Sequence, residues 1–244
     1  MMNLVSAEWL KLRTTRLLHG MIPATVVLSA AAVAGAVLSL DGAAELESSE
    51  GIRRVLSVTG TGALLMLLVG IMISAGEYRF GTAADTFLTT PRRHRVVLAK
   101  LIVGAQCGLG AGAITSIACI GIASLLYNIE GATFPFGDAD VWLTLAGTVV
   151  YSTLFAVLGV GLGSVIRNQT LAVAVALAWF AVVEHILVNL APDIGRWLPA
   201  TAGQAIVRTP LDDLLSPLAA VVLLSAYGAA AAVAGLRVVV TRDT

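Results

Sequence analysis

Six apolar stretches, each long enough to cross a lipid bilayer as a helix, constrain the fold of this chain. A transmembrane helix needs about 20 consecutive, mostly apolar residues. The stretches lack the alternating polar residues of a barrel strand, so we expect an all-α, polytopic membrane protein. The prediction is a single transmembrane domain over residues 1–244, with spans at 21–40, 57–75, 96–127, 141–166, 170–190 and 217–240.

The scarcity of charge supports lipid as the solvent of much of the surface. Charged residues make up 12% of the chain, whereas a soluble domain usually carries about 25%. The formal net charge is zero, so nothing in the overall charge indicates nucleic acid as a partner.

The distribution of basic residues predicts the orientation. Six spans place both termini on one side, and the positive-inside rule makes the side richer in Lys and Arg cytoplasmic. The terminal side carries Lys11, Arg13, Arg16, Arg79, Arg92, Arg93, Arg95, Lys100, Arg167, Arg237 and Arg242. The other side carries Arg53, Arg54, Arg196 and Arg208. We therefore expect a multi-pass protein of the plasma (inner) membrane with both termini in the cytoplasm.

The segment before the first span, "NLVSAEWLKLRTTR", has helical periodicity. Trp9 and Leu12 share an apolar face, and Trp9 would anchor the helix among the lipid headgroups. The residues expected to face water are Glu8, Lys11 and Arg13. The segment is predicted to be an amphipathic interfacial helix; the alternative is a basic flank that only sets topology.

Sequence motifs for nucleotide binding, metal binding and nucleophilic catalysis are absent. No G-x-x-x-x-G-K-[ST] occurs, and the histidines are scattered without metal-ligand spacing. We therefore expect no enzymatic activity, no metal and no cofactor bound by this chain. Glycines at 104, 108 and 112 and at 159, 161 and 163 favour close helix packing, either within the chain or as a homodimer seam.

One ionisable pair, Glu184 and His185, is expected inside a span, and we expect no other buried charge. A carboxylate within hydrocarbon is costly, so it indicates a substrate path, a gate or a proton relay. The alternative is a position near the outer interface, paired with Arg196. The proline-rich segment 190–216 that follows is too apolar for a solvated loop and too broken for a span, which predicts short outer-leaflet helices.

A charged window at residues 75–100 separates the second and third spans. Gly81 permits a turn, and Thr82 can cap a short helix that continues to about residue 88. Thr90 and Pro91 then suit the cap and first position of the next helix. The window is predicted to hold a short cytoplasmic helix with Phe87 on its apolar side.

These features resemble the membrane permease of ABC transporters of the type-2, exporter-like class, the subunit without its own ATPase domain. The resemblance rests on "EWLKLRTTR", "GEYRFGTAADTFLTTPRRHRVVLAK", the six spans and the broken segment before the last span. It implies that the short cytoplasmic helix is a coupling helix, which docks on a separate ATPase subunit. The residues it assigns to coupling are Glu77, Arg79, Gly81, Thr82, Asp85, Phe87, Leu88, Pro91 and Arg93.

The resemblance also implies partners and an activity. Two ATPase subunits, which bind ATP and Mg, would assemble with this permease and a second one, either a copy or a sister subunit. The second and fifth spans would line a path between the permeases. The exported substrate would be hydrophobic or amphipathic, such as a drug, a lipid-like molecule or a peptide. The alternatives are an ion-coupled secondary transporter that uses Glu184, and a non-transporting membrane sensor or scaffold.

Overall fold

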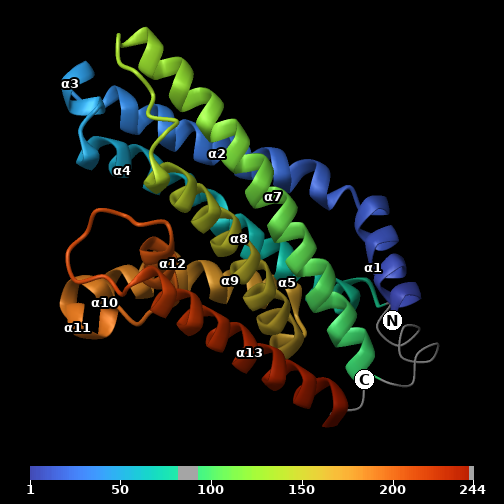
Figure 1. The fold of residues 1–244 in the computed structure, drawn as a ribbon. Coiled ribbons are helices and arrows are strands. Elements are labelled where there is room, and N and C mark those ends of the chain that lie inside the picture. Colours follow the sequence, from blue (N-terminus) through green and yellow to red (C-terminus); the bar gives the residue numbers. More distant parts are fainter. Residues whose placement is uncertain (82–92, 242–244) are drawn as a thin grey trace.

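The computed structural model describes residues 1–81 and 93–241, and every regular element in these ranges is helical (Figure 1). The elements are α1 (Met2–Thr14), α2 (Leu17–Leu38), α3 (Ala43–Leu46), α4 (Ser49–Ser57), η1 (Val58–Gly62), α5 (Ala63–Phe80), α7 (Arg93–Ile129), α8 (Ala139–Ile166), α9 (Gln169–Ala178), η2 (Trp179–Val183), α10 (Glu184–Leu190), α11 (Pro192–Gly195), α12 (Pro199–Ile206) and α13 (Pro217–Thr241).

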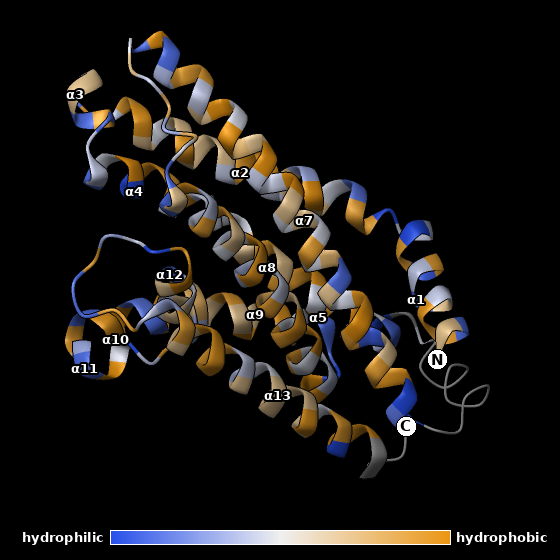
Figure 2. Cartoon of the chain, in the orientation of Figure 1, coloured by the Kyte–Doolittle hydropathy of each residue, from blue (hydrophilic) through white to orange (hydrophobic). Residues whose placement is uncertain are grey.

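Six helical stretches in the described ranges are long and apolar enough to cross a membrane, as predicted. They are Leu17–Leu38, Ser49–Arg79, Arg93–Ile129, Ala139–Ile166, Gln169–Leu190 and Pro217–Val239. Figure 2 shows apolar residues along most of their length. The protein is therefore a multi-pass membrane protein. We call the end of the bundle that carries α1 and the last turn of α13 the terminal end (Figure 1); its assignment to the cytoplasm stays a prediction.

The second span begins earlier than expected, because α4 continues through the 3₁₀ turn η1 into α5. Residues 49–56 were expected to belong to a charged loop. Ser48 caps α4 by accepting a hydrogen bond from the Gly51 N–H, at 3.0 Å. Val55 and Leu56 are buried, whereas the neighbouring arginines are exposed. The segment is therefore an amphipathic helix whose apolar side joins the protein core.

Helix α8 lies at the centre of the bundle and packs against α5, α7 and α13. The glycines of α7 face it at close range. A Cβ atom added at Gly108 would lie 2.6 Å from the Ser152 carbonyl oxygen, and one at Gly112 would lie 2.8 Å from the Val149 Cα. These glycines therefore serve packing within the chain, the first of the two predicted roles.

The second and fifth spans differ in how much of their surface the rest of the chain covers; the expectation that both line a transport path stays a prediction. Of the most apolar window in Ser49–Arg79, 67% is buried inside the protein, against 17% for Gln169–Leu190. The fifth span, made of α9, η2 and α10, therefore presents far more free surface than the second. The second span is an internal support of the bundle.

Two short helices, α11 and α12, form between the fifth and sixth spans, as the prolines predicted. Pro192 and Pro199 each stand in the first turn of their helix. Helix α12 packs into the protein rather than lying free: Ala202 and Ile206 are buried, and Gly203 faces the ring of Tyr151. Contact with α8 and α13 therefore holds this helix in place.

Candidate functional site

Four charged side chains meet inside the terminal end of the bundle, and we call them the charge cluster. They are Glu8 and Lys11 of α1, Glu77 near the end of α5, and Lys100 in the third turn of α7. Both lysines of the chain belong to it. Helix α1 lies beside the beginning of α7 in Figure 1, and this packing brings the charges together.

The two ammonium groups and two carboxylates alternate. Lys100 Nζ lies 2.9 Å from Glu8 Oε2 and 3.1 Å from Glu77 Oε1, and it also donates to the Ile73 carbonyl oxygen at 3.1 Å. Lys11 Nζ lies 2.7 Å from Glu8 Oε1 and 2.6 Å from Glu77 Oε1. The formal charges of the cluster therefore cancel.

Most of the charge cluster is buried, so each charge needs a partner. The side chains of Lys100, Glu8 and Glu77 are only 5%, 8% and 8% exposed, while that of Lys11 is 42% exposed. Buried charges are tolerated when they are paired and hydrogen-bonded. Burial alone would lower the pKa of Lys11, but hydrogen bonds and charge attraction from Glu77 and Glu8 outweigh it and raise the pKa above its ordinary value.

The charge cluster corrects two expectations. Glu8 was expected to face water, but it is buried, because it lies one helical turn from the buried Leu12 and so shares the inner face of α1. Glu184 and His185 were expected to be the only buried charges, which is also wrong. Lys100 was not recognised as a site residue, although a lone lysine inside an apolar span is a usable signal.

A cavity of about 430 Å³ lies directly beside the charge cluster. Its lining residues are Glu8, Lys11, Leu12, Thr14, Thr15, Leu17, Met72, Ile73, Gly76, Glu77, Arg79, Lys100 and Gln169. Gln169 opens α9 and is 7% exposed, and its Oε1 atom has no hydrogen-bond partner among the described residues. The cavity therefore combines paired charges, apolar side chains and an unpaired acceptor.

The coupling residues predicted around the charged window fall into two groups. Gly81 ends α5 in the left-handed conformation, with φ of 71°, and its N–H bonds the Glu77 carbonyl, so the predicted turn is confirmed. Arg79 is exposed at the end of α5. Arg93 donates to the Val239 carbonyl oxygen at 2.9 Å, which joins α7 to α13. The remaining predictions, at Thr82, Asp85, Phe87, Leu88 and Pro91, lie outside the described residues.

Glu184 binds the beginning of α12. Its Oε1 accepts hydrogen bonds from the N–H groups of Ala200, at 2.5 Å, and Thr201, at 3.2 Å. The expected pairing with Arg196 is not observed, because that guanidinium lies over the Trp197 ring, 5.8 Å from its centroid. The adjacent His185 is exposed and points elsewhere. Glu184 therefore stabilises the helix N-terminus, which carries two of the N–H groups that have no partner within the helix.

Replacing Glu184 with leucine should lower the free energy of unfolding by about 1–2 kcal/mol, the usual cost of losing a helix cap. Glu184→Gln, which keeps an acceptor oxygen, should lose less than half as much. Thermal unfolding of the purified protein in detergent measures both. Glu130, exposed at the end of α7, supplies the control variant Glu130→Leu. Equal stability of the Leu and Gln variants at position 184 would contradict the capping role.

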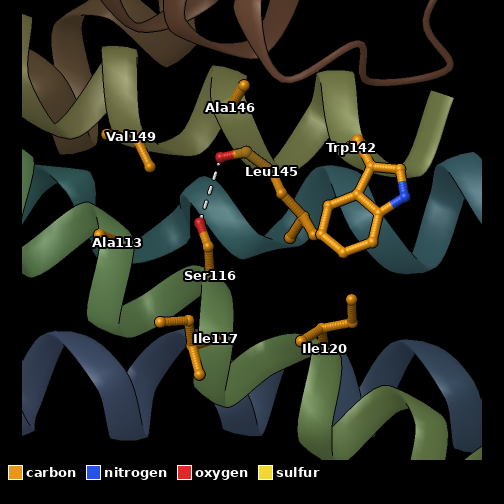
Figure 3. Close-up of a pocket in the computed structure, with 8 residues that line it drawn as sticks. All are labelled: Ala113, Ser116, Ile117, Ile120, Trp142, Leu145, Ala146 and Val149. Carbon is orange, nitrogen blue, oxygen red and sulfur yellow. Dashed lines mark hydrogen bonds between the residues drawn. The ribbon is translucent and has the colours of Figure 1, made fainter. Parts of the chain in front are cut away.

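A second cavity, of about 310 Å³, lies between α7 and α8 (Figure 3). Its walls are apolar, with Ile117, Trp142 and Val149 among them. The Ser116 hydroxyl is already used, because it donates to the Leu145 carbonyl oxygen at 3.1 Å, the dashed line in Figure 3. Among the described residues, no titratable side chain lines this cavity. It offers apolar contact and no acid–base chemistry.

A half-exposed ion pair network lies at the end opposite the terminal end. Asp140, in the first turn of α8, binds Arg53 of α4 at 2.8 Å and Arg208, beyond α12, at 2.6 Å. These side chains are 28–51% exposed, and such pairs each contribute about 0–1 kcal/mol. The network holds three elements in register and contributes little to stability.

Comparison with known protein families and with curated proteins finds no match to this sequence. Within residues 1–81 and 93–241, no group of His, Cys, Asp and Glu side chains could hold a metal ion. The function is therefore inferred from the geometry of the charge cluster and its surroundings.

Proposed function

We propose that this chain is the permease subunit of an ATP-driven ABC transporter of the type-2, exporter-like class. It would export a hydrophobic or amphipathic substrate across the plasma membrane, powered by a separate ATP-binding subunit. The observation that carries the proposal is the charge cluster, since it joins α1 to both helices that flank residues 82–92.

Because of the helices that flank them, residues 82–92 are a suitable docking segment for an ATPase subunit. Helix α5 ends at Phe80 and α7 begins at Arg93, so a force applied to the intervening segment reaches both helices. Lys100 holds them together through Glu77, and Glu8 extends this unit to α1. Separating a buried ion pair costs several kcal/mol, so the three helices are expected to move as one body.

The proposed partners and substrate path rest on two further observations: the sequence has no G-x-x-x-x-G-K-[ST] motif, and the fifth span has an exposed apolar surface. Since the sequence has no nucleotide-phosphate cradle, ATP and Mg would bind two partner ATPase subunits. A second permease, a copy or a sister chain, would complete the complex. The fifth span, with exposed Leu171, Trp179 and Val182, offers the apolar surface for a path or a contact between permeases.

The test is the variant Phe87→Arg, expressed with an affinity tag and purified from its native membranes. We expect at least about a tenfold loss of co-purifying Mg-dependent ATP hydrolysis, because an arginine in place of a central apolar anchor removes about 2 kcal/mol or more of binding free energy. The matched control is Phe136→Arg, at an exposed phenylalanine near the opposite end of the bundle. Unchanged assembly and unchanged substrate-stimulated hydrolysis in Phe87→Arg would refute the coupling role.

The second candidate is an ion-coupled secondary transporter that uses Glu184. The observation in its favour is that Glu184 Oε2 is buried and has no hydrogen-bond partner among the described residues. This candidate requires transport that depends on a proton or sodium gradient and survives depletion of ATP. A non-transporting sensor or scaffold requires partner binding without measurable flux. Flux measurements in ATP-depleted vesicles separate the three.

A further inference from the structure

The cavity beside the charge cluster has the size and the mixed lining of a binding site for an amphiphile. Its volume of about 430 Å³ falls within the range of about 300–1,000 Å³ common for small-molecule sites. Leu12, Leu17, Met72 and Ile73 supply apolar contacts, and the charge cluster and Gln169 supply polar ones. An occupant with one apolar and one charged part would match both.

Gln169 supplies an acceptor that the protein leaves unused. The residue is 93% buried, and its Oε1 atom has no partner among the described residues. A Cβ atom added at Gly76, which lines the cavity, would lie 3.9 Å from this oxygen. A buried carbonyl oxygen without a hydrogen-bond partner destabilises the protein, so an occupant that donates an N–H or O–H group to it is favoured.

Lys11 supplies the complementary donor. Its ammonium group has three N–H bonds, and among the described residues Glu8 and Glu77 each accept one hydrogen bond from it. The side chain is 42% exposed and lines the cavity. The third N–H can therefore bind an anionic oxygen without breaking the charge cluster. The charge cluster is neutral, and Arg79, which also lines the cavity, adds one positive charge, so the lining favours an occupant that carries an anionic group.

We propose that this cavity binds the phosphoethanolamine headgroup of a membrane phospholipid. The phosphate binds Lys11, the ammonium group donates to Gln169 Oε1, and the first carbons of the lipid lie along Leu12, Leu17 and Met72. The source is the bilayer, because these apolar contacts continue into α2, of whose spanning window only 28% is buried in the protein. The inference is independent of the proposed transport function, since it needs no ATPase partner.

The test compares two lipids that differ only at the headgroup nitrogen. Dioleoyl-phosphatidylethanolamine has three N–H bonds, whereas dioleoyl-phosphatidylcholine has three methyl groups in their place. Binding to the delipidated full chain in detergent, measured by native mass spectrometry, should favour phosphatidylethanolamine by about five- to tenfold, the net effect of one typical hydrogen bond. Equal binding of the two lipids would overturn the proposal.

Variants at position 169 identify the acceptor. Gln169→Leu should abolish the preference, and it should fold, since the Oε1 atom that it removes has no protein partner. Gln169→Glu should retain the preference or increase it. The matched control Gln204→Leu, at an exposed glutamine of α12, should leave the five- to tenfold preference intact. A preference that persists in Gln169→Leu would refute the role of this oxygen.

Competition with free phosphoethanolamine separates the lipid from a soluble zwitterion. The soluble compound should displace bound lipid only at a large molar excess, because it gains nothing from the apolar contacts. Displacement at equal concentration would overturn the assignment to a membrane lipid.

Discussion

Replacing Lys100 with methionine should lower the free energy of unfolding by about 3–5 kcal/mol, the cost of removing one partner of a buried ion pair. The methionine fills a similar volume but carries no charge. Glu8 and Glu77 would both lose the buried ammonium group that they contact, and the charge cluster would be left with one positive charge fewer than negative charges. Thermal unfolding in detergent, with lipid content held constant, measures the loss.

Two further variants separate charge imbalance from lost packing. In Lys11→Met the same substitution is made at the lysine that is 42% exposed, so water can reach the site and the loss should be clearly smaller. In the double variant Lys100→Met, Glu77→Gln the formal charges balance again, and part of the stability should return. If Lys100→Met were as stable as the wild type, the buried ion pairs would not stabilise the terminal end.

Replacing Gly159 with valine should destabilise the protein by about 3 kcal/mol or prevent its folding, the upper part of the range for overpacking. Gly159 is in α8, where it faces α5. A Cβ atom there would meet the Leu67 carbonyl oxygen and lie 3.1 Å from the Gly70 Cα. Both are backbone atoms, so no rotamer change can make room, and the two helices would have to separate.

The matched control is Gly110→Val in α7, where an added Cβ would meet nothing within 4 Å. This variant should change the free energy of unfolding by about 0.5 kcal/mol or less. The yield of folded monomer in size-exclusion chromatography, together with thermal unfolding, compares the two. Similar behaviour of both variants would mean that the α5–α8 contact is not tightly packed.

The positions of the spans could be predicted, because the bilayer sets the length of an apolar helix. The turn at Gly81 was also predictable, since glycine readily adopts positive φ. Helix α4 was missed because Arg53 and Arg54 suggested a loop, whereas its apolar residues face a core formed by distant parts of the chain. A short amphipathic helix beside a span has too few residues for its period to stand out.

The partner of Glu184 could not be predicted either. The sequence indicated a buried carboxylate and suggested Arg196 as its partner, but the partners are the N–H groups of Ala200 and Thr201. Every residue except proline supplies a backbone N–H, so no particular residue type marks such a partner. This partner is visible only in the fold, where the segment after α10 brings the first turn of α12 next to Glu184.

The sequence alone determined that this is a helical membrane protein with six crossings, because the hydrophobic length and the scarcity of charge leave lipid as its solvent. Only the tertiary structure decided which charges meet. Glu8 and Lys100 are 92 residues apart, and their pairing depends on how α1 packs against α5 and α7. Local periodicity determines which face of a helix is apolar, whereas the partner of a buried charge depends on the packing of entire helices.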